Sequence, residues 1–203
     1  MMRVIVVGGT GTIGSAVVKV LSAGHEVVAV GHHKGAFQVD LASPDSITRL
    51  FKAVGSFDAV VSTAGIAKFA GFDQLSHDDY LLGLNNKLMG QANLVRIGTE
   101  FVTEHGSFTL TSGILSQKPI KGSASISMVN AGLEGFVRAA ALDLPRSLRV
   151  NVVSPPWVTE TLLARGMDPT IGLSAERVAQ AYLAAIEGTM TGQVLDPRAT
   201  ANR

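Results

Sequence analysis

The chain has 203 residues, of which 46% are hydrophobic, so it can bury the core of the single domain that we expect over residues 1–203. Charged residues make up 16% and leave a formal net charge of +1, which gives no long-range field and makes nucleic acid and acidic membrane surfaces unexpected partners. The absence of cysteine excludes a disulfide framework, a thiolate metal site and a cysteine nucleophile. The five histidines are scattered except for His32 and His33, so they predict no other metal site.

Short apolar, β-branched runs alternate along the chain with longer stretches of helical periodicity. This alternation predicts an α/β fold in which helices cover both faces of a parallel sheet of about seven strands. The predicted strands are 3–7, 26–30, 37–39, 58–62, 107–111, 149–153 and 192–195. The predicted helices lie near 12–23, 44–54, 74–104 with a break, 125–143 and 174–187, and Ser174 is the expected cap of the last one. The N-terminal apolar run is too short for a signal peptide or a membrane span, so we expect a cytoplasmic protein.

A glycine-rich turn, "GGTGTIG", follows the first predicted strand and opens the first predicted helix. Glycines let a backbone approach a pyrophosphate closely, and a helix N-terminus supplies free N–H groups and the positive end of its dipole. Glycine turns also occur without a ligand, but the position between a strand and an amphipathic helix favours nucleotide binding. We therefore predict a single Rossmann-type, doubly wound parallel sheet. Its predicted phosphate-binding residues are Gly8, Thr10, Gly11, Thr12, Ile13 and Gly14.

The segment "AVGHHKG" after the second predicted strand bears on the choice of cofactor. NAD-selective sites usually carry an acid there, which accepts hydrogen bonds from the ribose, and this segment has none. His32, His33 and Lys34 can face a 2′-phosphate instead, so the predicted cofactor is NADP(H) and NAD is less favoured; an exposed polar loop is the alternative. The connection is also half the usual length of a parallel crossover, so either the third strand is vestigial or its partner helix is lost. Both alternatives shorten the adenine side of the site.

Five motifs stand in an order that resembles the short-chain dehydrogenase/reductase family over nearly the whole chain: "GGTGTIG", "VDL" (39–41), "STAG" (62–65), "AGLEGFVRAAAL" (131–142) and "RVNVVSPPWVTET" (149–161). The resemblance implies that Asp40 and Leu41 contact the adenine and that Ala64 and Gly65 line the nicotinamide-ribose side. It also implies that Pro155, Val158 and Thr159 lie against the nicotinamide and the pyrophosphate. In the alternative interpretation, the small residues of "STAG" only let helices approach the end of a strand.

The catalytic positions of this family are altered in the chain. The family's reductases use Ser, Tyr and Lys, with an Asn that completes a proton relay. When "ISMVNAGLEGF" is aligned with the family's YxxxKxAxxGF pattern, Ile126 takes the tyrosine position and Asn130 the lysine position. Ser112 matches the family's serine, and Lys87 in "KLMG" takes the place of the relay asparagine. Lysine and asparagine have therefore exchanged places.

We predict that Lys87 and Asn130 form a polar pair near the ribose or an ordered water, since the resemblance makes their positions neighbours; an ordinary surface lysine is the alternative. Ser112, Lys87 and Asn130 are thus the candidate catalytic residues. Tyr80 is interpreted as a helix-start residue and Tyr182 as part of the core. Loss of a general acid typically costs ~10²–10⁴ in rate, so ordinary carbonyl reduction is expected to be very slow or absent.

Two functions agree with this pattern. One is an NADP-dependent oxidoreductase with a non-standard active site, and the other is a family member without turnover that senses NADP(H) or acts as a partner subunit. The small-molecule substrate cannot be read from the residues: Trp157, Leu162, Leu163 and Met167 either line a small apolar pocket or cover the core. The resemblance implies a homodimer or homotetramer that pairs through the helix Ser127–Leu144.

Overall fold

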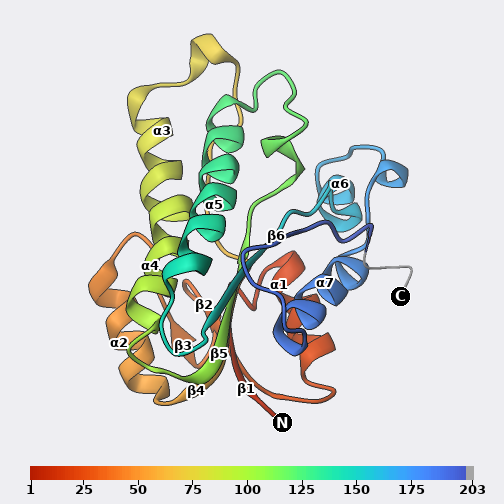
Figure 1. Cartoon of the computed structure of the whole chain (residues 1–203). Helices are drawn as coiled ribbons and strands as arrows, with labels where there is room; N and C mark the ends of the chain where they lie inside the picture. The colour runs from red at the N-terminus through yellow and green to blue at the C-terminus, as the bar shows by residue number, and fades with distance from the viewer. Residues whose placement is uncertain (200–203) are drawn as a thin grey trace.

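The computed structural model describes residues 1–199, and its centre is one seven-stranded sheet in which every pairing is parallel (Figure 1). The strand order is β3-β2-β1-β4-β5-β6-β7. The order reverses between β1 and β4, and in open α/β sheets ligands bind outside the carboxyl ends of the strands at such a point. The strands are β1 (Arg3–Val7), β2 (Glu26–Gly31), β3 (Phe37–Gln38), β4 (Phe57–Ser62), β5 (Val102–Thr111), β6 (Arg149–Val153) and β7 (Val194–Leu195).

Helices cover both faces of the sheet, as Figure 1 shows. On one face lie α1 (Thr12–Leu21), α7 (Ala175–Glu187) and the short α6 (Thr159–Ala164). The other face carries α2 (Pro44–Val54), α3 (His77–Gly83), α4 (Gly90–Gly98) and α5 (Ala124–Asp143). A π-helical segment, η2 (Leu84–Met89), joins α3 to α4. Three short 3₁₀ turns are η1 (Phe72–Gln74), η3 (Ile114–Ser116) and η4 (Pro169–Ile171).

The two apolar cores explain why the strands are continuous apolar runs. Val4 and Val6 of β1 belong to the cluster formed with α1 and α7, whereas Ile5 and Val7 belong to the cluster formed with α2, α4 and α5. Successive strand residues point to opposite faces, so a strand that is covered on both faces is apolar at every position. The predicted fold class, a doubly wound α/β sheet of seven strands, is confirmed.

The predicted helix near 74–104 differs most from the structure. The break is η2, which keeps the chain helical from His77 to Gly98 while the hydrogen-bonding pattern changes. The prediction was wrong for residues 102–104, which open β5. The reason is tertiary: Val102 pairs with Phe57, and the pairing then jumps to Ser107 and Ala59 across a bulge. A local helical pattern carries no information about that pairing.

The short connection after β2 agrees with both alternatives drawn from the sequence. β3 is a two-residue edge strand, and residues 32–36 form no helix. A Cβ on Gly31 would lie 2.1 Å from the carbonyl oxygen of Lys34, so glycine is required where the chain folds back. In residues 1–199 no helix has the length and apolar character needed to cross a bilayer.

Candidate functional site

The glycine loop has the tight geometry that a phosphate-binding turn needs. Gly8 adopts a positive φ of 83°, and a Cβ there would lie 2.8 Å from the Thr63 hydroxyl. A Cβ on Gly14 would lie 1.9 Å from the carbonyl oxygen of Gly8, so the first turn of α1 packs directly on the loop. Because α1 begins at Thr12, its first N–H groups have no acceptor within the helix and are available to an anion.

Main-chain bonds hold this loop in place. The Gly8 N–H donates to the Val30 carbonyl at 2.8 Å, and the Thr63 N–H donates to the Val7 carbonyl at 2.9 Å. The Thr63 hydroxyl also donates to Val7 O at 3.2 Å. These bonds tie the loop to β2 and to the residue that follows β4.

A cleft of about 230 Å³ opens beside the loop at the carboxyl ends of β1, β2 and β4. Asn86 of η2, which the sequence reasoning missed, also lines the cleft, and its Oδ1 accepts the Ile66 N–H at 2.9 Å. Its lining includes the backbone of the glycine loop, the imidazole of His32 and the apolar side chain of Leu41. It brings together seven of the predicted cofactor-binding residues: Gly8, Thr10, Gly11, His32, Leu41, Ala64 and Gly65.

The other predicted cofactor-binding residues do not line this cleft. They are Thr12, Ile13, Gly14, His33, Asp40, Pro155, Val158 and Thr159. Asp40 has a local role, since its Oδ1 accepts the Ala42 N–H at 2.9 Å and so braces the turn before α2. Val158 forms an isolated bridge with Leu173. Cofactor contacts by these eight residues stay predictions.

Lys87 and Asn130 are hydrogen-bonded, which confirms the predicted pairing and contradicts the surface-lysine alternative. The Lys87 ammonium donates to Asn130 Oδ1 at 2.8 Å and to the Ser112 carbonyl at 3.1 Å. Asn130 Nδ2 in turn donates to the Gly113 carbonyl at 3.3 Å. Burial lowers the pKa of Lys87 from 10.5 to about 8, because a low-dielectric surrounding disfavours the charged form.

The pair adjoins the cleft through Gly65. A Cβ on Gly65 would lie 2.5 Å from Lys87 Cγ, so the lysine side chain runs directly across this cleft-lining glycine. Lys87 comes from η2, and π-helical turns occur frequently at functional sites. The predicted roles of Lys87 and Asn130 in chemistry stay predictions.

A buried carboxylate behind Ser112 was missed by the sequence reasoning. Glu134 is 4% exposed, and its Oε1 accepts the hydroxyls of Ser116 at 2.6 Å, Ser112 at 3.1 Å and Ser154 at 3.3 Å. A serine hydroxyl has one proton, so in this arrangement the proton of Ser112 points to Glu134. The signal in the sequence was an acid four residues after Asn130, on the inner face of α5.

Helices α4 and α5 hold the end of β5 from two sides. Gln91, one turn after Lys87, is fully buried and exchanges two hydrogen bonds with the main chain of Thr111, at 2.9 and 3.0 Å. Asn130 and Glu134 are likewise one helical turn apart and bind the next residues of the chain. Two i, i+4 pairs thus fix residues 111–113. Gln91 was also missed, because a lone glutamine in a helix is usually exposed.

The remaining aromatic and apolar candidates fall outside this arrangement. Tyr182 is fully buried and its hydroxyl lies 2.6 Å from Thr111 Oγ1, which confirms its interpretation as core. Ile126, at the position that the resemblance gives to tyrosine, is half-buried at the start of α5. Leu162 is fully buried, whereas Leu163 and Met167 are exposed, and a role of these residues in a substrate pocket stays a prediction. The helical twist of α6 points the neighbouring residues Leu162 and Leu163 in different directions.

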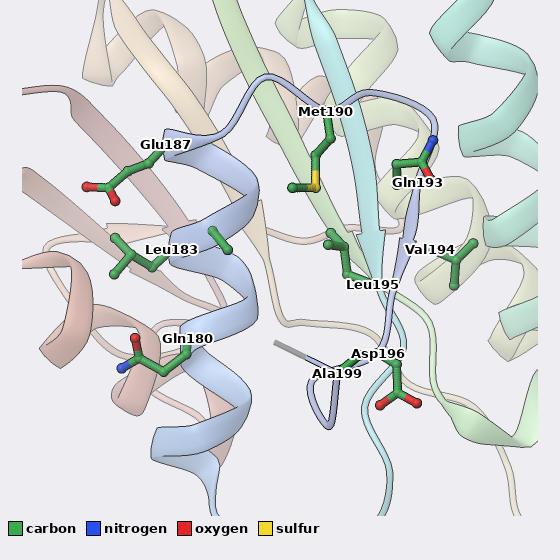
Figure 2. Close-up of a pocket in the computed structure, with 10 residues that line it drawn as sticks. Gln180, Leu183, Glu187, Met190, Gln193, Val194, Leu195, Asp196 and Ala199 are labelled. Carbon is green, nitrogen blue, oxygen red and sulfur yellow. The ribbon is translucent and has the colours of Figure 1, made fainter. Parts of the chain in front are cut away.

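A larger groove, of about 680 Å³, lies between α7 and β7 (Figure 2). Leu183, Met190 and Leu195 line it together with polar side chains such as Gln180. It contains none of the predicted site residues, so size alone does not mark the candidate site in this protein.

Comparison with known proteins gives consistent relatives. The family model described as enoyl-(acyl carrier protein) reductase matches residues 15–191. Carbonyl reductase family member 4 of Danio rerio is 28% identical in an alignment that covers 94% of each chain. The crystal structure of the protein lin1944 from Listeria innocua is 35% identical, with a TM-score of 0.92, and the match covers 97% of this chain and 99% of that one. A small-chain dehydrogenase in complex with NADPH is 27% identical, with a TM-score of 0.83 and coverages of 96% and 95%.

Proposed function

Since the chain belongs to the short-chain dehydrogenase/reductase family, we propose that it binds NADP(H) in the cleft at the glycine loop and acts as an oxidoreductase with a non-standard proton-transfer site. The observation that carries this proposal is the glycine loop, where Cβ atoms at Gly8 and Gly14 would collide with neighbouring atoms. Such a crowded loop before a helix N-terminus suits a pyrophosphate. The NADPH complex of a relative 27% identical to this chain supports the same cofactor.

The preference for the 2′-phosphate is assigned to the turn after β2. His32 lines the cleft, and the segment from Gly31 to Gly35 contains no acid that would accept the ribose hydroxyls of NAD. His33 and Lys34 add donors and charge on the same exposed turn. These three side chains support NADP(H) over NAD(H).

The chemistry differs from that of a tyrosine-dependent reductase. A bound nicotinamide supplies or accepts the hydride. Within the chain, Lys87 holds a proton on Nζ, and a pKa near 8 suits a group that gives up a proton close to neutral pH. Ser112 keeps its hydroxyl proton toward Glu134, and Ile126 has no proton to give. Of these three side chains, Lys87 is the one that holds a transferable proton.

A second candidate function, cofactor binding without turnover, is favoured by the same contacts. The hydroxyl of Ser112, the carbonyl of Ser112 and both polar atoms of Asn130 have partners inside the protein. A catalytic group whose hydrogen bonds are already made must break one to act on a substrate. In this function the protein senses NADP(H) or serves as a partner subunit.

We also propose that the chain forms a homodimer or homotetramer through α5. An apolar groove of about 380 Å³ runs between α4 and α5, with Phe136 and Leu144 among its lining residues. Two large apolar side chains are exposed nearby in the chain: Leu142 lies in α5, and Met89 immediately precedes α4. Sedimentation of the wild type and of a Phe136→Asp variant tests this: the variant is expected to be the smaller species.

The first experiment is a calorimetric titration of the purified protein with NADPH and, separately, with NADH. We expect NADPH to bind at least tenfold more tightly, since a 2′-phosphate adds charge-assisted hydrogen bonds. Equal binding of both would contradict the assignment of the turn after β2. Binding of neither would contradict the proposed function itself. Consumption of NADPH with candidate carbonyl compounds then separates the oxidoreductase from the sensor.

A further inference from the structure

The Lys87 side chain crosses the cleft-lining Gly65, and within residues 1–199 its ammonium has no paired carboxylate. Its two acceptors, Asn130 Oδ1 and the Ser112 carbonyl, are both neutral. Among residues 1–199, no carboxylate oxygen forms an ion pair with Nζ within 4.0 Å. An ammonium has three N–H donors, so two bonds leave one donor over.

Among residues 1–199, none of the acids on the elements packed around Lys87 forms an ion pair with its ammonium. Glu134 of α5 stands behind Ser112, and three serine hydroxyls bind its Oε1. Asp78 and Asp79 lie in the first turn of α3, where the Asp79 carboxylate bonds to Ser76. α4 contributes the neutral Gln91 to this region, and the loop after β4 contributes Gly65. The elements around Lys87 therefore supply neutral acceptors to the ammonium and no carboxylate within ion-pair distance, among the residues that the structure describes.

The position of Lys87 makes the remaining donor relevant to a ligand. Its side chain crosses Gly65, and the preceding residue, Asn86, lines the cleft. One π-helical turn thus contributes both a cleft wall and a cation. A buried ammonium that lacks an ion-pair partner gains more from an incoming anion than an exposed one does, because water screens the interaction less.

We propose that Lys87 is a recognition site for an anionic oxygen of the substrate, and that the substrate class is small organic carboxylates. The inference rests on the proposed function, because the carboxylate would bind at the end of the cofactor cleft. Its charge would complete the third hydrogen bond of the ammonium and supply the missing counter-ion. The lowered pKa of Lys87 agrees with an ammonium that is desolvated and unpaired.

The test uses butyrate as the probe and butyramide as its neutral match, each titrated calorimetrically into the NADPH-saturated protein at pH 7. We expect butyrate to bind at least about tenfold more tightly than butyramide, the typical gain from a charge-assisted hydrogen bond. Butyrate binding is expected to weaken as the pH rises through about 8, because the ammonium then loses its proton. Equal binding of the two probes would overturn the proposal.

Variants separate recognition from folding. Lys87→Met is expected to abolish the preference for butyrate, and Lys87→Arg to retain most of it. Asn130→Asp places a carboxylate where Oδ1 now accepts the ammonium, so we expect it to compete with butyrate and weaken its binding about tenfold. Lys52→Met, at an exposed lysine in the last turn of α2, is the matched control and is expected to leave butyrate binding unchanged. A preference for butyrate that survives in Lys87→Met would overturn the proposal.

The cofactor titration keeps the two claims apart. If NADPH fails to bind, the proposed function fails, whatever butyrate does. If NADPH binds and Lys87→Met weakens NADPH but not butyrate, the ammonium serves the cofactor and the carboxylate proposal is wrong. If NADPH binds and only butyrate responds to Lys87→Met, both claims hold.

Discussion

The two ends of the candidate site are held by different kinds of structure. At the glycine loop the main chain defines the shape, since Gly8 and Gly14 occupy places where any Cβ would collide. At the end of β5 the side chains do so, through the bonds of Lys87, Asn130 and Glu134. A site made of backbone tolerates few replacements, whereas a site made of side chains can exchange groups between helices and keep its packing.

This difference explains how the glycine loop of the family's pattern is kept while its catalytic positions are altered. Lys87 and Asn130 stand in exchanged positions relative to the family's pattern, yet their 2.8 Å bond still joins η2 to α5. The polar contact between the helices is preserved while the group that carries the charge has moved. A comparable exchange at Gly14 is sterically excluded.

The largest effect is expected from Gly14→Ala, which tests the main-chain half. A Cβ 1.9 Å from the Gly8 carbonyl oxygen forces the loop and α1 apart. We expect a loss of about 3 kcal/mol in the free energy of unfolding and an NADPH affinity at least ~100-fold lower. Urea denaturation and calorimetry measure the two. Gly24→Ala is the matched control, since nothing lies within 4 Å of its Cβ; an equal effect there would contradict the steric argument.

Glu134→Ala tests the side-chain half and should rank second. Three serine hydroxyls lose their shared acceptor and a buried space opens, so we expect a loss of about 2–3 kcal/mol in the free energy of unfolding. Glu134→Gln keeps an acceptor oxygen and should cost less. Glu176, which forms an exposed ion pair with Lys19, provides the comparison: Glu176→Ala should cost under ~1 kcal/mol. Equal losses in urea denaturation would show that the serine cluster contributes little.

The pH dependence of the free energy of unfolding tests whether the Lys87 ammonium is buried. Its pKa falls from 10.5 in the unfolded chain to about 8 in the fold, so the unfolded state binds more protons between these values. Stability of the wild type relative to Lys87→Met should therefore rise with pH from about 8 to 10.5, by at most ~1.4 kcal/mol per pH unit. Below pH 8 the cost of the buried charge is fully present and the difference should be flat. Denaturation midpoints of both proteins across this range provide the measurement, and a flat difference throughout would contradict the burial of the ammonium.

The smallest effect is expected from His32→Ala. His32 lines the cleft at an exposed turn, where the contribution of one polar contact to a phosphate is modest. We expect NADPH affinity to fall about fivefold, the equivalent of ~1 kcal/mol, while NADH affinity stays the same. His33→Ala, one residue outside the cleft lining, should have a smaller effect. An equal loss for both nucleotides would remove His32 from phosphate recognition.

The strands and helices could be predicted from the sequence because the apolar residues that form the two cores recur at nearly regular spacing along the chain. Each of the seven strands was predicted, and so was a helix near 44–54, where α2 runs from Pro44 to Val54 with Ser43 as its cap. The start of β5 was not accessible, since it depends on Val102 meeting Phe57 from a distant part of the chain. Of the cleft, the sequence identified the glycine loop, His32, Leu41, Ala64 and Gly65 but not Asn86.

Residue types thus determined the doubly wound sheet, the glycine loop and the exchanged Lys87 and Asn130, because these follow from periodicity, spacing and comparison of motifs. The tertiary structure alone decided which polar groups meet. Glu134 and Gln91 look like ordinary helix residues until the fold brings them against Ser112 and Thr111. A hydrogen bond depends on a few ångströms of separation between residues far apart in the chain, and no local pattern encodes that distance.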